Sequence, residues 1–113
     1  MAKPDDSLRL GHMCDTAQKA LHFSQGKSRA DLDQDELLRL ALVRLLEIIG
    51  EAASRVSQGT RDRFPAIPWP NIVGMRNRLV HGYDQIDLEI LWQTLIQDLR
   101  SMIDELRKAL TSL

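Results

Sequence analysis

The feature that most restricts the fold of this chain is a broad apolar stripe of helical spacing between residues 33 and 56. Apolar residues that recur every three or four positions are typical of an amphipathic helix. A stripe this wide covers more than one neighbour, so we expect this helix at the centre of the fold, with a face also available to a second subunit. The stripe contains Leu37, Leu38, Ala41, Leu42, Leu45, Leu46, Ile48, Ile49, Ala52, Ala53 and Val56, and the narrow polar strip beside it contains Arg44, Glu47, Glu51 and Arg55.

The start of this central helix also has a sequence signal. Asp33 is followed three residues later by Glu36, the spacing of a capping box. Leu32 and Leu37 have the spacing of a hydrophobic staple around it. The pattern predicts that the helix begins just after Asp33.

Three further helices follow from similar signals. The first starts after Asp5 or Asp6 and stops at Gly26. The segment FPAIPWPN contains three of the four prolines, so residues 64–70 cannot be regular helix, although Pro70 can stand in the first turn of a following helix. A short third helix is predicted from Pro70 to His81, and the fourth begins at Asp84 or Asp87. No stretch alternates with a period of two for long. Residues 1–113 therefore predict a single all-α domain, an up-and-down four-helix bundle.

Composition excludes several classes of function. The net charge of −1 gives no overall attraction to nucleic acid, so any polyanion site must be a local patch. The single cysteine, Cys14, excludes an intrachain disulfide and a cysteine-based zinc site. No histidine pair has metal-ligand spacing, so we expect no metal and no cofactor. The polar start MAKPDDSLRL and the lack of a long apolar run predict a cytoplasmic protein without a membrane span.

The stretch RNRLVHGY, residues 76–83, is the strongest candidate for a functional site. With 11 arginines and three histidines, chance gives roughly 0.3 Arg–His pairs at this spacing. Asn77 directly after Arg76, and Tyr83 two residues after His81, make the combination far rarer. On an ideal helix of about 100° per residue, Asn77 and His81 share a face, whereas Arg76 and His81 lie about 140° apart.

That offset leaves three arrangements open. The helix loosens near Gly82, both side chains line a cleft, or a second copy of the motif faces the first across a two-fold axis. A plainer interpretation is that Arg76, Arg78 and His81 only solvate a helix end, where cations complement the dipole.

The segment WPNIVGMRNRLVHGY, followed by DLEILW, resembles the HepT-like branch of the HEPN superfamily, whose signature in this branch is RNxxxHxY. IGEAA at residues 49–53 and the IPW turn are also similar to that family. The resemblance covers essentially the whole chain and implies a HEPN-like helical homodimer, in which the two motifs form one cleft.

The resemblance also implies an activity. It implies the toxin of a type VII-like toxin–antitoxin system, a metal-independent endoribonuclease. The partner antitoxin would be a nucleotidyltransferase that neutralises the toxin by adding AMP to the motif tyrosine, Tyr83. The superfamily leaves open a non-catalytic nucleotide-binding or interaction module paired with such a nucleotidyltransferase. A structural helical dimer without a ligand is a third interpretation.

The residues suit RNA cleavage by the RNA's own 2′-OH. His81 would move protons near neutral pH, and Arg76 would stabilise charge on the phosphorus oxygens. Asn77 would orient the imidazole or hydrogen-bond the phosphate. Glu51 either approaches the cleft or pairs with Arg55 four residues later, and the pair is favoured. Candidate RNA-binding residues that would form a local positive patch are Arg78, Arg61 and Arg63.

Overall fold

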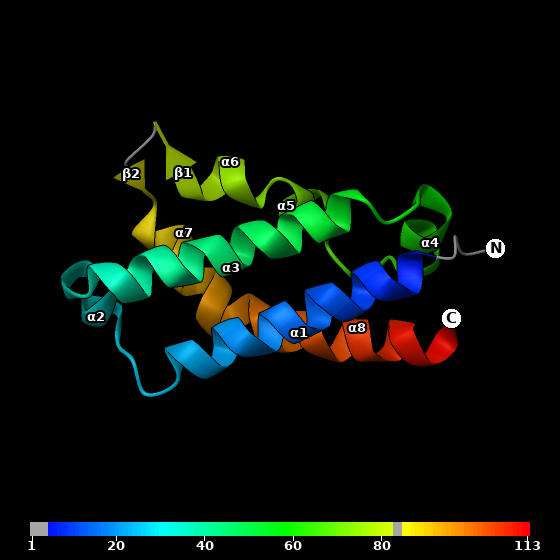
Figure 1. Ribbon diagram of the computed structural model, residues 1–113, viewed down its shortest axis with the longest axis horizontal. Helices are drawn as coiled ribbons and strands as arrows, with labels where there is room; N and C mark the ends of the chain where they lie inside the picture. Colours follow the sequence, from blue (N-terminus) through cyan, green and yellow to red (C-terminus); the bar gives the residue numbers. More distant parts are fainter. Residues whose placement is uncertain (1–4, 83–84) are drawn as a thin grey trace.

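Three long helical segments frame the computed structural model, which describes residues 5–82 and 85–113 (Figure 1). The helix α1 packs against both α3 and α8, and this confirms the prediction of an all-α bundle. The C-terminal segment contains one π-helical turn, η1, where Thr94 Oγ1 donates to the carbonyl of Ile90 over 2.7 Å. The bounds of these elements are α1 Asp6–Ser24, α3 Glu36–Ser54, α7 Leu88–Gln93, η1 Thr94–Asp98 and α8 Leu99–Ser112.

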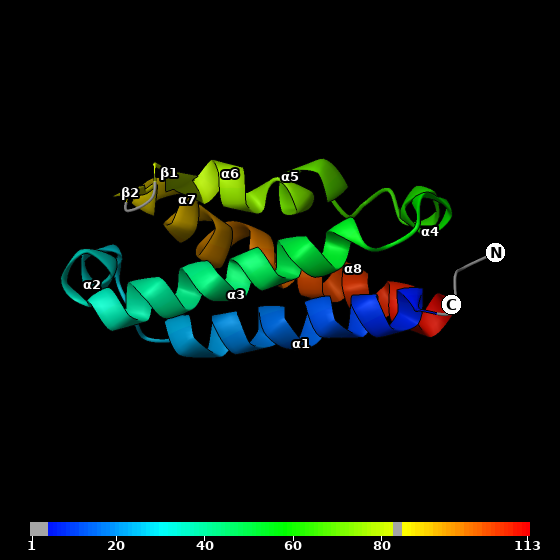
Figure 2. The same cartoon turned by 45° about the horizontal axis from the view of Figure 1, so that its top comes forward.

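Two short helices complete the bundle on the side of α3 away from α1 (Figure 2). They are α5 (Trp69–Val73) and α6 (Met75–Leu79), and both contact α3. Gly50 on α3 allows this close approach, because a Cβ there would lie 2.6 Å from the Ile72 carbonyl oxygen. The segment that carries the motif is therefore seated directly on the central helix.

The predicted third helix from Pro70 to His81 is wrong in its extent and continuity. It breaks at Gly74, which separates α5 from α6, and it ends at Leu79. The chain then turns extended and forms a small antiparallel hairpin, β1 (Val80–His81) with β2 (Gln85–Ile86). Asp87 N–H also donates to the Leu79 carbonyl over 2.7 Å. The sequence predicted no strand because a strand is recognised by a longer run of alternating apolar and polar residues, and these strands have only two residues each.

The predicted start of the central helix also needs correction. A separate short helix, α2 (Arg29–Gln34), comes first, with a capping box between Ser28 and Asp31. The cap of α3 is Asp35, whose side chain accepts from the N–H of Leu38 over 3.0 Å. Leu37 is 80 % exposed, so the predicted staple with Leu32 does not form.

The N-terminal end of α1 is tied to α4 (Gln58–Arg63) through one buried carboxylate. Asp6 is 1 % exposed and accepts hydrogen bonds from Ser57 N–H, Ser57 Oγ and Thr60 Oγ1 at 2.6–3.0 Å. It therefore joins two elements instead of capping α1. The other end of α1 stops at Ser24, two residues before Gly26, whose φ of +72° favours glycine.

The fourth predicted helix begins after Asp87, which is one of its two candidate caps. Asp87 Oδ1 accepts from Ile90 N–H over 3.1 Å, and α7 follows; the other candidate, Asp84, lies outside the described residues. No helix in the described parts of the chain combines the length and the apolar character that a membrane crossing needs. The predicted central role of α3 agrees with its seven buried residues, and Cys14 on α1 is buried in the same core.

Candidate functional site

Arg76 projects from α6 beside the polar strip of the central helix. Its side chain is 76 % exposed, and its Nε lies 3.5 Å from Glu47 Oε2 on α3. Glu47 is the more buried partner, with 23 % of its side chain exposed. A carboxylate held on a long helix restricts the orientation of a guanidinium on a short one. The ion pair therefore presents Arg76 to solvent in a defined direction.

His81 stands at the end of β1, with 55 % of its side chain exposed. Its Nε2 lies 3.5 Å from Asp87 Oδ2. The other carboxylate oxygen of Asp87 accepts the capping hydrogen bond of α7, and this bond fixes the position of the carboxylate beside the imidazole ring. Donation from the Ile90 N–H, together with the nearby His81, lowers the pKa of Asp87 against the opposing effect of desolvation. The imidazole thus has a carboxylate beside one of its two nitrogens.

Asn77 and His81 do not share a helical face, contrary to the sequence geometry, because α6 ends between them. Asn77 is exposed on α6, next to Arg76. The partner of the imidazole is Asp87 instead. From the sequence, Asp87 was predicted only as a helix cap and Glu47 only as part of a polar strip. The two-residue strands are too short to give an alternating pattern, so the sequence carried no clear signal for the hairpin that brings Asp87 close to His81.

A hollow of about 480 Å³ adjoins Arg76 on the α3 side. Leu40 on α3 is 51 % exposed here, and Val80 and Ile86 of the hairpin complete an apolar wall. His81 does not line this hollow, because successive residues of a strand point to opposite sides and Val80 faces inward. Among the residues that the structure describes, Arg76 therefore lines this hollow and His81 does not.

The three arginines proposed to contact RNA have separate local environments. Arg61 donates to the carbonyls of Ala53, Ser54 and Val56, where it closes the C-terminal end of α3, and its guanidinium lies 5.9 Å from the Trp69 ring centroid. Arg63 donates to the Ser112 carbonyl over 3.1 Å and lies over the Phe64 ring. Arg78 is half-buried.

Arg78 lines a hollow of about 320 Å³ between the α5–α6 segment and the C-terminal helix, together with Asn71, Gln97 and Asp98. Glu51 pairs with Arg55 at 3.4 Å, as the sequence spacing predicted. Glu51 also lines a hollow that includes Arg76.

Tyr83 lies outside the described residues. Among residues 5–82 and 85–113, no group of three or more His, Cys, Asp or Glu side chains is arranged to hold a metal ion.

The class of protein follows from comparison with known families. Residues 13–109 match the family model described as Ribonuclease HepT-like. The chain belongs to this HepT-like family, and this confirms the resemblance seen in the sequence.

Relatives span most of the chain. A protein of Methanocaldococcus jannaschii named "Putative RNase MJ1380" is 34 % identical over 98 residues, which is 87 % of this chain and 90 % of the relative. "Putative RNase TTE0752" of Caldanaerobacter subterraneus subsp. tengcongensis is 31 % identical over 89 % of this chain and 90 % of its own length. "Probable ribonuclease HepT" of Thermococcus cleftensis is 36 % identical over 66 % of this chain and 70 % of its own. No solved structure matches the chain significantly.

Proposed function

We propose that this protein is an endoribonuclease that cleaves RNA without a metal ion, with Arg76 and His81 as its catalytic residues. The observation that carries the proposal is the pairing of each with its own carboxylate, Glu47 for Arg76 and Asp87 for His81, while both side chains stay exposed. Membership of the HepT-like family and the ribonuclease names of the relatives support the same activity.

The chemistry requires only groups that the RNA and these side chains supply. The 2′-oxygen attacks the adjacent phosphorus, the bond from phosphorus to the 5′-oxygen breaks, and a 2′,3′-cyclic phosphate and a 5′-hydroxyl result. His81 exchanges a proton with the attacking or the leaving oxygen, since both steps suit an imidazole. Arg76 stabilises the negative charge that grows on the equatorial oxygens. Asp87 holds the imidazole in orientation, and Asn77 would hydrogen-bond the phosphate.

The active form in this proposal is a homodimer whose two motifs form one cleft. Within one chain, the hollow beside Arg76 excludes His81, so a second copy is the simplest source of the missing partner. Leu40 on α3 is 51 % exposed in the apolar wall of that hollow, and Leu37, three residues earlier on the same helix, is 80 % exposed. Such side chains are suited to an interface between subunits.

Control of the activity would be covalent. A nucleotidyltransferase antitoxin would transfer AMP to the hydroxyl of Tyr83, two residues after His81, and release pyrophosphate from ATP. The added phosphate would place a negative charge beside the catalytic arginine and obstruct the cleft. The protein would then act as the toxin of a toxin–antitoxin pair in the cytoplasm. A gene for a small nucleotidyltransferase beside the gene for this chain would support the pairing.

The direct test is to purify the chain without a partner and to incubate it with cellular RNA in the presence of EDTA. We expect cleavage, and we expect His81→Ala to abolish it. Intact RNA with the unmodified wild-type protein, or cleavage that survives His81→Ala, contradicts the proposal. Mass spectrometry of the protein co-expressed with its neighbouring nucleotidyltransferase then tests Tyr83, for which an added AMP is the expected result.

A further inference from the structure

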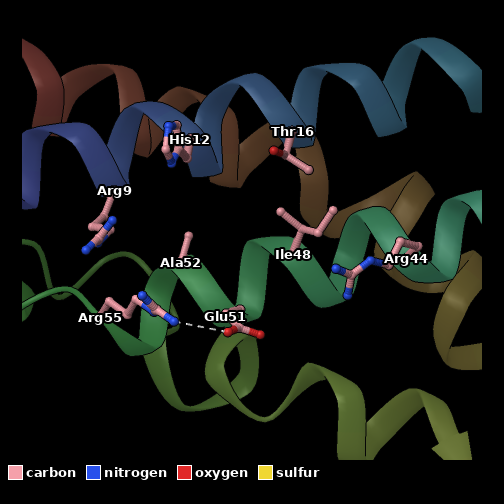
Figure 3. Close-up of a pocket in the computed structure, with 8 residues that line it drawn as sticks. All are labelled: Arg9, His12, Thr16, Arg44, Ile48, Glu51, Ala52 and Arg55. Atoms are coloured by element: carbon pink, nitrogen blue, oxygen red, sulfur yellow. Dashed lines mark hydrogen bonds and ion pairs between the residues drawn. The ribbon is translucent and has the colours of Figure 1, made fainter.

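A further hollow, a groove of about 280 Å³, lies between α1 and α3, away from the hairpin (Figure 3). Arg9, His12 and Thr16 line it from α1, and Ile48 and Ala52 form an apolar floor on α3 (Figure 3). Its remaining lining residues are Arg44, Glu51 and Arg55. Three arginines against a single glutamate make this groove basic in a chain whose net charge is −1.

Two of these arginines lack an anionic partner within the described residues. Arg9 Nε is buried and has no hydrogen-bond acceptor there, an arrangement that is rare in folded proteins. Arg44 is exposed and forms no ion pair with another described residue. Only Arg55 is paired, with Glu51 at 3.4 Å, and both of those side chains are well exposed. The groove thus presents donors that are matched to an anion.

The groove continues toward the candidate active site. Arg44 and Glu51 also line the adjoining hollow of about 470 Å³, which includes Arg76 and Glu47. The guanidinium groups are therefore distributed along α1 and α3 and lead to the catalytic arginine, instead of converging on one point. A small anion needs convergent donors, whereas a chain of phosphates needs a series of them.

We infer that the groove between α1 and α3 binds the phosphate backbone of the RNA strand whose scissile phosphate lies at Arg76. Arg9, Arg44 and Arg55 contact successive phosphates outside the reaction centre. The apolar floor of Ile48 and Ala52 packs against the sugars. This inference rests on the proposed ribonuclease function and extends it to a substrate-binding site. Arg44 lies at the junction of the two hollows.

The experiment measures binding of a 2′-O-methylated single-stranded RNA, which cannot be cleaved because it lacks a free 2′-OH, at several salt concentrations. The test variant is the double substitution Arg9→Gln with Arg44→Gln. Each lost phosphate contact is expected to reduce the slope of log affinity against log salt by about 0.7, so affinity near 0.1 M salt should fall on the order of tenfold or more. The matched control is Arg100→Gln with Arg107→Gln, which removes the same charge from exposed positions on α8 and should leave affinity and slope close to wild type.

A third variant reverses the sign of the effect. Glu51→Gln removes the one acidic side chain of the groove and releases Arg55, so RNA should bind more tightly, by about two- to fivefold. Because Glu51 and Arg44 are exposed, Glu51→Gln and Arg44→Gln alone keep the test valid if the Arg9 substitution impairs folding. Thermal unfolding of each variant identifies that case.

The outcomes separate this inference from the proposed function. Equal losses of RNA affinity in the groove variant and the α8 variant overturn the inference. A change in oligomeric state that only the groove variant causes also overturns it, because the groove would then bind a second copy of the chain. Unchanged RNA affinity and an unchanged salt slope in the groove variant also overturn it. If wild-type protein cleaves RNA in any of these cases, the proposed function stands. Weaker RNA binding by the groove variant of a chain that cleaves no RNA would support the groove and contradict the ribonuclease.

Discussion

Glu47 Oε2 on the central helix lies 3.5 Å from Arg76 Nε on α6, and the two residues come from segments that the proline-rich turn separates in sequence. The pair is largely exposed on the arginine side, so its contribution to stability is at most about 1 kcal/mol. Its effect is on the direction of the guanidinium.

Glu47→Gln should lower kcat about tenfold, since misdirected catalytic groups lose this much or more. KM should fall as well, because the variant removes an anion beside the RNA. Steady-state kinetics with a defined RNA measure both constants. An unchanged kcat would show that Glu47 does not position Arg76, and an unchanged melting temperature would confirm that the effect is local.

Asp87 has two roles that two substitutions can separate. Asp87→Asn keeps a good helix cap but removes the charge beside His81, so cleavage should fall at least tenfold while stability changes by only a few tenths of a kcal/mol. Asp87→Ala removes both the helix cap and the charge beside His81, so it should also lower the unfolding free energy by about 1 kcal/mol. Urea unfolding and RNA cleavage are measured on both variants. Equal activity of Asp87→Asn and wild type would exclude a carboxylate role at His81.

Protonation of the Asp87 carboxylate should lower the stability of the fold in acid. The pKa of Asp87 is lowered from its ordinary value of 3.8, mainly by the Ile90 N–H, so its ionised form stabilises the fold above that value. This contribution is lost as the pH falls below 3.8 and through the folded-state pKa. Asp31, whose pKa is lowered by the Ser28 N–H, acts in the same direction. Urea titrations from pH 6 to pH 2 should show a flatter profile for Asp87→Asn; an identical profile would contradict the assignment.

A cleft shared between two subunits can be tested by mixing inactive proteins. Arg76→Ala and His81→Ala should each be inactive alone. After unfolding and refolding together, mixed dimers contain one site with both wild-type groups, so about a quarter of wild-type activity should return for a two-fold symmetric dimer. Sites that lie within single chains predict no recovery, and a monomeric mass by light scattering would also contradict the dimer.

Because the α5–α6 segment packs closely against α3, alanine substitutions at two glycines should have opposite effects on the stability of the fold. Gly50→Ala places a Cβ 2.6 Å from the Ile72 carbonyl oxygen and should destabilise the fold by about 1–3 kcal/mol, because backbone must move. Gly11→Ala is the control: nothing lies within 4 Å of its Cβ, and on α1 alanine should stabilise by about 0.5–1 kcal/mol. Chemical denaturation of both gives the comparison, and similar values would exclude the close approach as a constraint.

Periodicity and composition were sufficient for the helical class of this fold. The stripe from Leu38 to Val56 identified the central helix, and Asp87 was correctly chosen as a cap, because both signals are local and depend on spacing along one helix. RNRLVHGY was selected for the same reason: the combination of residue types is rare. The HepT-like family then followed from that motif and its flanks, and the match over residues 13–109 confirmed it.

Tertiary structure decided the geometry of the site. The predicted helix to His81 assumed that a regular helix continues, but Gly74 and the extended Val80 end it, and the hairpin moves His81 off the face of Asn77. Glu47 is brought to Arg76 by the packing of α6 on α3, and Asp87 is brought to His81 by the pairing of β1 with β2. The sequence alone determined which residues are chemically suited to act; only packing between segments determined which carboxylate each one meets, because such contacts depend on distances in space that spacing along the chain does not contain.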